Sequence, residues 1–152
     1  MTLHHNASPN QERAQRLAYA SATVYGDHLD PTVWTTYFGI EPDISVVKGE
    51  RFKTPSGRMS TYPGRTGVWG CTSKAAITED NLDAHLKYLI LRLRLPRPDL
   101  PALLVNCGAT MRFFCYWSNY TGDRVPVIDP ALRDAIESSG ATIEIDEYPP
   151  RQ

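Results

Sequence analysis

The chain has 152 residues, of which 41% are hydrophobic and 22% are charged, and its formal net charge is −1 at pH 7. These values predict one folded domain with a sizeable core and exclude a mostly disordered chain. The near-neutral charge argues against nucleic acid as a dedicated partner, and the lack of an apolar run of about 18 residues argues against a membrane-spanning helix.

The N-terminal residues and the cysteines bear on the compartment. The first residues, MTLHHNASPNQERAQ, are polar and lack the apolar segment of a signal peptide. Cys71, Cys107 and Cys115 are an odd number without CxxC spacing, which favours reduced thiols over disulfides or a zinc site. We expect a cytoplasmic protein without metal or cofactor, with a flexible arm over residues 1–14 and one α+β domain over residues 15–150.

An alternating segment over residues 17–25 predicts the first strand. One face of this strand carries only small or aliphatic side chains, and these are Ala18, Ala20, Ala22 and Val24. Small side chains let neighbouring elements approach closely, so we expect helices to pack on this face.

An Asp-Pro pair at positions 30 and 31 predicts a helix over residues 31–38, because aspartate is a good N-cap and proline suits the first helical position. Gly39 is expected to end this helix. A second strand over residues 44–47, a long basic loop and a third strand over residues 67–73 follow.

The clearest helix is expected to begin at a Thr78 cap and to end at Pro96. Leucine and isoleucine recur on it at the spacing of a core-facing stripe: Leu82, Leu86, Leu89, Ile90 and Leu93. We expect His85 to lie on the exposed side of this helix.

The last third of the domain contains one ambiguous segment, since residues 101–105 could form a short helix or a strand. Residues 110–118 are apolar on both faces, as in a central strand that is covered on both sides or lies at a contact surface. A second Asp-Pro pair begins a helix that Gly140 is expected to end, and residues 141–148 predict the final strand.

Two segments, LDPTVWTTYFGIEPDISV and IDPALRDAIESSGATIEI, share the plan of an Asp-Pro cap, a helix, a glycine and a strand. They could be a duplicated β-α-β unit or two good helix starts. The resulting order, β-α-β-β-α-β-α-β, predicts an α+β fold with a mainly antiparallel sheet, helices packed on it and a ferredoxin-like arrangement.

The loop over residues 48–65 is the candidate binding surface, because a long polar loop needs water or a partner. It contains glycines that could approach an anion, but it lacks the GxxxxGK[ST] spacing of a phosphate loop. Arginine, tyrosine and methionine are favoured in protein interfaces. The binding residues predicted for a protein or an anion are Lys48, Arg51, Lys53, Arg58, Met59, Tyr62 and Arg65.

The aromatic residues around the end of the fourth predicted strand and the acidic residues of the last strand each have two interpretations. Tyr116, Trp117 and Tyr120 lead into a loop and could form either an aromatic contact surface or part of the core. The acidic residues of the last strand form a solvent face or a contact for a basic partner. His28 has no nucleophile to pair with, so the sequence predicts no catalytic residue.

Several short motifs together resemble a known family. They are the Asp-Pro helix, FGI-x-P at residues 38–42, Lys48-Gly49-Glu50, Trp69 with Ser73, the amphipathic helix and the final strand that ends in Tyr148. Over about residues 16–148 the chain resembles the bacterial and phage family named domain of unknown function 4279. The resemblance implies no particular catalytic residues, and the frequent position of such small domains beside toxin genes implies an immunity role.

The sequence therefore predicts a non-enzymatic protein-binding domain, and the resemblance implies an immunity or antitoxin-like protein that neutralises a toxin encoded nearby. The alternative is a small-ligand or nucleotide (phosphate) sensing domain, or a small enzyme, that uses the basic loop over residues 48–65. The sequence leaves the oligomeric state open.

Overall fold

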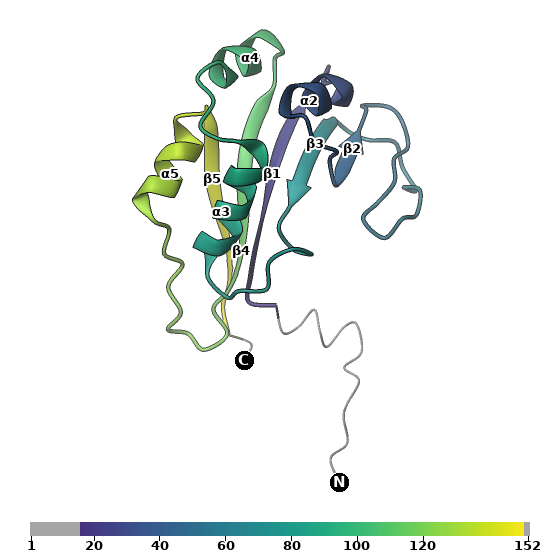
Figure 1. Cartoon of the computed structure of the whole chain (residues 1–152). Helices are drawn as coiled ribbons and strands as arrows, with labels where there is room; N and C mark the ends of the chain where they lie inside the picture. The colour runs from purple at the N-terminus through teal and green to yellow at the C-terminus, as the bar shows by residue number, and fades with distance from the viewer. Residues whose placement is uncertain (1–15, 151–152) are drawn as a thin grey trace.

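The computed structural model describes residues 16–150, and the arm expected over residues 1–14 lies outside this range. Its strands are β1 (Ala18–Gly26), β2 (Ile44–Val46), β3 (Gly67–Thr72), β4 (Thr110–Ser118) and β5 (Ala141–Tyr148). Its helices are α2 (Pro31–Phe38), α3 (Leu82–Leu93), α4 (Leu100–Asn106) and α5 (Pro130–Glu137). Figure 1 shows α2, α3 and α5 on one side of the sheet.

The five strands form one sheet in the order β2-β3-β1-β4-β5. The pairs β2–β3, β1–β3 and β1–β4 are antiparallel, whereas β5 returns through α5 and pairs parallel with β4. The predicted α+β class is confirmed, and the sheet is mixed rather than purely antiparallel. The ferredoxin-like arrangement and the duplicated unit stay predictions.

Both helices that were expected after Asp-Pro pairs are present and capped by aspartate. The Asp30 carboxylate accepts the Thr32 amide at 3.0 Å, and the Asp129 carboxylate accepts the Ala131 amide at 2.8 Å. Gly39 follows α2 with a φ of 71°, a conformation that glycine adopts without steric cost. Helix α5 ends at Glu137, earlier than expected, because residues 138–140 leave the helix and form turns.

The start of α3 differs from the sequence prediction. The N-cap is Asn81 rather than Thr78, and its side chain accepts the Ala84 amide at 2.9 Å. The residues before it form a turn, in which the Ile77 amide donates to the Ser73 carbonyl at 2.9 Å. The ambiguous segment over residues 101–105 belongs to a helix, α4.

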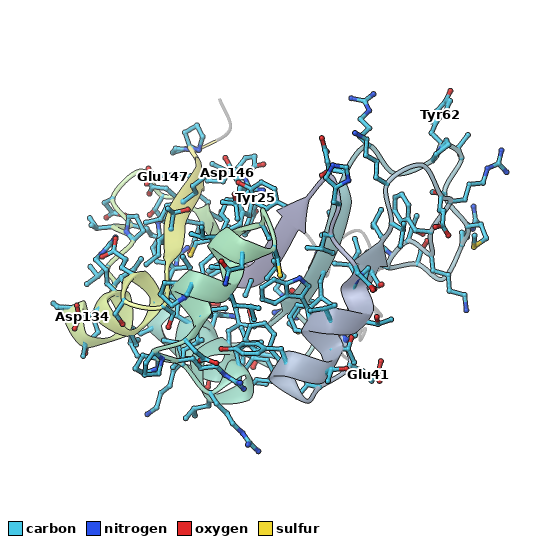
Figure 2. The ribbon with its side chains drawn as sticks, turned by 90° about the horizontal axis from the view of Figure 1, so that it is seen from above. Tyr25, Glu41, Tyr62, Asp134, Asp146 and Glu147 are labelled. Atoms are coloured by element: carbon cyan, nitrogen blue, oxygen red, sulfur yellow. The ribbon has the colours of Figure 1, made fainter. Side chains whose placement is uncertain are left out.

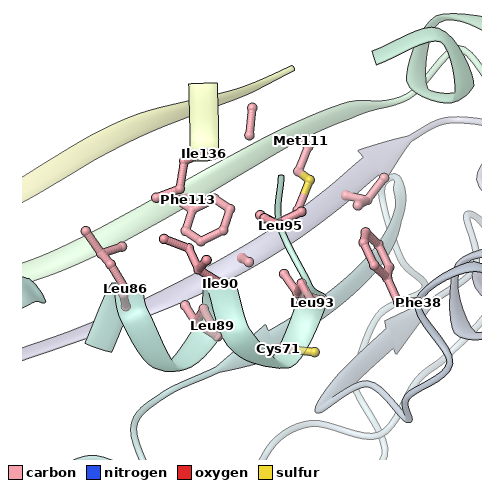
Figure 3. Close-up of a cluster of buried hydrophobic side chains, with 14 of the residues drawn as sticks. Phe38, Cys71, Leu86, Leu89, Ile90, Leu93, Leu95, Met111, Phe113 and Ile136 are labelled. Atoms are coloured by element: carbon pink, nitrogen blue, oxygen red, sulfur yellow. The ribbon is translucent and has the colours of Figure 1, made fainter. Parts of the chain in front are cut away.

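The core lies between α3, α5 and the alanine face of β1 (Figure 3). Ala18, Ala20 and Ala22 are 0–1% exposed, and their small size leaves room for α3 against the sheet. The predicted leucine stripe is buried, and it meets side chains that point inward from β4 and α5, namely Met111, Phe113 and Ile136.

The other face of the sheet is only half-buried, and among the described residues no helix covers it. We call it the open sheet face, and it carries Tyr19, Ser21, Thr23 and Tyr25 of β1, Val68 and Thr72 of β3, Arg112, Phe114 and Tyr116 of β4, and Glu144, Asp146 and Tyr148 of β5. Strand β4 is therefore central but covered on one side. Within residues 16–150, no helix has the length and hydrophobicity needed to cross a bilayer.

Candidate functional site

The loop between β2 and β3 folds into a small hairpin of its own, which we call the basic loop (residues 47–66). In its outer part the Thr54 amide donates to the Arg58 carbonyl and the Ser60 amide donates to the Phe52 carbonyl, each at 2.7 Å. At its base the Gly64 amide donates to the Glu50 carbonyl at 2.8 Å. The backbone of the basic loop is therefore ordered before any partner arrives.

Ser60 holds the two arms of the basic loop together from inside. It is only 9% exposed, and its hydroxyl accepts the Phe52 amide at 3.1 Å and donates to the Tyr62 carbonyl at 2.8 Å. These two hydrogen bonds fix the backbone next to the exposed Tyr62 side chain.

Replacing Ser60 with alanine is expected to loosen the basic loop without unfolding the domain. Loss of the hydroxyl lowers the free energy of local opening of the loop by about 1 kcal/mol, because the Phe52 amide loses its side-chain acceptor. Hydrogen exchange at the Phe52 amide should become several-fold faster, while amides in β1 exchange unchanged. Ser56→Ala is the matched control, since Ser56 is exposed in the same loop; equal exchange rates in both variants would contradict this role for Ser60.

The predicted binding residues of the basic loop lie together and point outward. Met59 is 59% exposed and Tyr62 is 77% exposed, and Figure 2 shows Tyr62 far from the body of the domain. The cations are also exposed, and they are Lys48, Arg51, Lys53, Arg58 and Arg65. This surface combines two apolar contacts with several positive charges.

Only one of those cations has an ion-pair partner among residues 16–150. Lys48 Nζ lies 3.2 Å from an Asp27 carboxylate oxygen, and the hydrogen bond from Lys48 holds the pKa of Asp27 below its ordinary value. The charge that remains on the basic loop is therefore positive and solvent-exposed.

The backbone amides of the basic loop are poorly placed for phosphate. The amides of Gly49, Gly57 and Gly64 all donate to carbonyls inside the loop. The chain then enters strand β3 rather than a helix, so no helix N-terminus follows to add its dipole. An anion could reach the side chains of this loop more easily than its amides.

The aromatic residues proposed as one contact surface, Tyr116, Trp117 and Tyr120, do not lie together. Trp117 is 5% exposed on the helix-covered face, and its Nε1 donates to the Arg124 carbonyl at 3.3 Å. Tyr116 lies on the opposite, open sheet face, because successive strand residues alternate. Tyr120 is 57% exposed in the loop after β4.

A different aromatic group occupies the open sheet face. The Tyr116 ring stacks on Tyr19 at a centroid distance of 4.9 Å and lies 5.1 Å from Tyr148. The alternation of residues 17–25 had already placed Tyr19 opposite the alanine face. The contact with Tyr148 depends on the pairing of β4 with β5, which no local pattern predicts.

A buried serine–histidine pair also escaped prediction. Ser73 and His85 are both 0% exposed, and their Oγ and Nδ1 atoms are 2.7 Å apart. His85 Nε2 donates to the Glu79 carbonyl at 2.7 Å, so in the neutral ring Nδ1 accepts the Ser73 hydroxyl proton. The expectation that His85 is exposed is wrong, because its ring ties the turn before α3 to the end of β3.

The Ser73–His85 pair has the atoms of a nucleophile and a base but no access for a substrate. The Ser73 oxygen additionally accepts the Ala20 amide at 2.9 Å, inside the sheet. We therefore assign the pair to stability rather than to catalysis.

The buried thiols are also unsuited to nucleophilic chemistry. Burial raises the pKa of Cys71 to about 11 and the pKa of Cys115 to about 12, so both stay protonated near neutral pH. In the part of the chain that the structure describes, no three His, Cys, Asp or Glu side chains gather as a metal-binding group.

Comparison with known proteins gives one result. A family model described as Domain of unknown function (DUF4279) matches residues 16–150. Neither the curated proteins nor the solved structures give a match.

Proposed function

The chain belongs to the DUF4279 family of domains of unknown function, and we propose that this member is a non-enzymatic protein-binding domain. The single observation that carries the proposal is the basic loop, which is internally hydrogen-bonded yet exposes Met59 and Tyr62 beside its cations. A surface that is ordered before binding loses less conformational entropy when the partner arrives.

The chemistry of the basic loop favours an acidic protein surface as its partner. Exposed positive charge steers an acidic partner during encounter, and aromatic, methionine and arginine side chains are frequent anchors in interfaces. The domain carries positive charge on the basic loop and acidic side chains on β5, and this charge separation orients a charged partner as it approaches the domain.

We further propose that the partner is a toxin encoded nearby and that this bacterial, cytoplasmic protein acts as its immunity protein. An inhibitor of this kind works by covering the active surface of its target and needs no catalytic group. The family resemblance and the exposed basic loop support this reading, and the internal use of the loop amides weighs against the alternative of a nucleotide-sensing domain or small enzyme.

We also propose that the fold has a ferredoxin-like arrangement. The strand order β2-β3-β1-β4, with helices in the β1–β2 and β3–β4 connections, supports a split β-α-β unit of this kind. The pair α5 and β5 would then be an addition, or the second copy of a duplicated β-α-β unit.

Reversing two charges of the basic loop is expected to weaken the complex and leave the fold unchanged. The double substitution Arg58→Glu, Arg65→Glu makes the charge of the basic loop more negative by four units. We expect its affinity for the protein partner to be at least about tenfold weaker. The measurement is calorimetric titration of the product of the neighbouring upstream reading frame.

The matched control reverses two exposed cations on the helix side, Lys87→Glu with Arg94→Glu, which gives the same change of net charge. This control should bind like the wild type, and all three proteins should unfold at nearly the same temperature. Equal affinity of the loop variant and the wild type would move the interface away from the basic loop.

A further inference from the structure

Arg112 lies on the open sheet face near the start of β4, and it contacts side chains on three strands. Its guanidinium lies 5.7 Å from the centre of the Tyr25 ring and 5.6 Å from the centre of the Phe114 ring. Its Nη1 donates to a Glu144 carboxylate oxygen at 3.2 Å. The two rings restrict how far the arginine can move.

A pocket of about 270 Å³ adjoins this arginine. Its walls come from β1, β3, β4 and the last residue of the basic loop, and they are Thr23, Tyr25, Thr66, Val68 and Arg112. One positive group, hydroxyl groups and an apolar wall of Val68 make a small site of mixed polarity. Since Thr66 follows Arg65 directly, the pocket lies at the foot of the basic loop.

The hydrogen bonding of Arg112 is incomplete in the described residues. Its Nε is buried and has no acceptor there. A buried donor without an acceptor costs about 1–3 kcal/mol, so an acceptor that reached the guanidinium would relieve this cost.

Glu144 shows which chemistry the guanidinium accepts. Its carboxylate sits on Arg112 from the neighbouring strand, but the Glu144 side chain is 54% exposed and that of Arg112 is 38% exposed. Solvent-exposed ion pairs contribute about 0–1 kcal/mol, so another carboxylate can displace Glu144 at little cost. Since Glu144 stays nearby, a singly charged, planar group fits better than a dianion.

We propose that Arg112 and the pocket beside it form a carboxylate-binding site, and that Glu144 pairs with the Arg112 guanidinium when the ligand is absent. The ligand is a free small carboxylic acid or an acidic side chain of a protein partner. In the second case the inference rests on the proposed function and places one partner carboxylate at the foot of the basic loop.

In the test, acetate and N-acetyl-glutamate amide are titrated separately into the protein, and the Arg112 Nε–H resonance is followed by NMR. Chloride is used to keep the ionic strength constant. Wild type should show saturable shifts in the millimolar range, and Arg112→Gln should lose the corresponding saturable shifts at Tyr25 and Thr66. Glu144→Gln should bind at least about threefold more tightly, because the internal competitor is gone.

The two probes separate the two sources of the carboxylate. Binding of N-acetyl-glutamate amide about tenfold tighter than acetate assigns the site to an acidic side chain, and equal or weaker binding assigns it to a free acid. Absence of saturable shifts up to about 100 mM, or equal binding by wild type and Arg112→Gln, would overturn the proposal.

The same experiment separates this proposal from the proposed function. The Arg58→Glu, Arg65→Glu variant should bind acetate within about twofold of wild type, because neither residue lines the pocket. If the probes fail to bind while that variant still loses the protein partner, the pocket proposal is wrong and the basic loop remains the interface.

Discussion

Trp69→Ala is expected to remove about 3–5 kcal/mol from the free energy of unfolding, which is a large share of the stability of a domain of this size. Trp69 is 0% exposed, and its ring stacks on Phe38 of α2 at a centroid distance of 5.0 Å. Its Nε1 donates to the Thr35 hydroxyl at 3.0 Å. The substitution therefore leaves a large cavity and breaks the attachment of α2 to β3.

Chemical denaturation of the purified variants measures this effect. Trp69→Phe is the matched control, because it keeps an aromatic ring against Phe38 and loses only part of the volume and the hydrogen bond. We expect this control to lose about 1–2 kcal/mol. A loss below about 1 kcal/mol for Trp69→Ala would contradict the packing of α2 on the sheet.

His85→Ala is expected to cost about 2–4 kcal/mol, because it leaves a cavity, removes one of the two acceptors of the Ser73 hydroxyl and removes the side-chain donor to the Glu79 carbonyl. The damage should be concentrated where β3 ends and α3 begins. Denaturation gives the total loss, and faster hydrogen exchange in the first turn of α3 gives its location. His85→Ala with wild-type stability would contradict the assignment of this pair to the fold.

The contribution of His85 should depend on pH in a defined direction. Burial lowers the pKa of His85 below its ordinary value of 6.5, so the unfolded chain binds this proton more readily than the folded domain does. The stabilisation by His85 is therefore complete above pH 6.5 and is lost as the pH falls toward the folded-state pKa. The stability gap between wild type and His85→Ala should narrow below that pH, and a gap that widens would contradict the burial of a neutral ring.

Local signals were enough to predict most of the elements. The Asp-Pro pairs, the alternation around Ala20 and the leucine stripe each depend on residues within a few positions of one another, and each produced the expected helix or strand. The predicted start of α3 at Thr78 was wrong. The Glu79 backbone carbonyl accepts a hydrogen bond from the His85 ring instead of a helical amide, and Asn81 caps the helix.

The candidate site also has a part that local sequence predicts and a part that depends on strand pairing. The composition of residues 48–65 predicted an exposed basic segment, and its cations are exposed in the structure. The Arg112–Glu144 pair could not be predicted, since the two residues are 32 positions apart and meet only because β5 pairs parallel with β4. Residues 110–118 are apolar on both faces, but the sequence does not say which face the helices cover.

The most direct test of the proposed immunity role is growth of a bacterial host that expresses the neighbouring upstream reading frame. We expect this frame alone to arrest growth and co-expression of the wild-type domain or of Lys87→Glu, Arg94→Glu to restore it. The Arg58→Glu, Arg65→Glu variant, present at the same level, should fail to restore growth. Normal growth with the neighbouring frame alone would contradict the immunity role, and full rescue by the loop variant would contradict the basic loop as the interface.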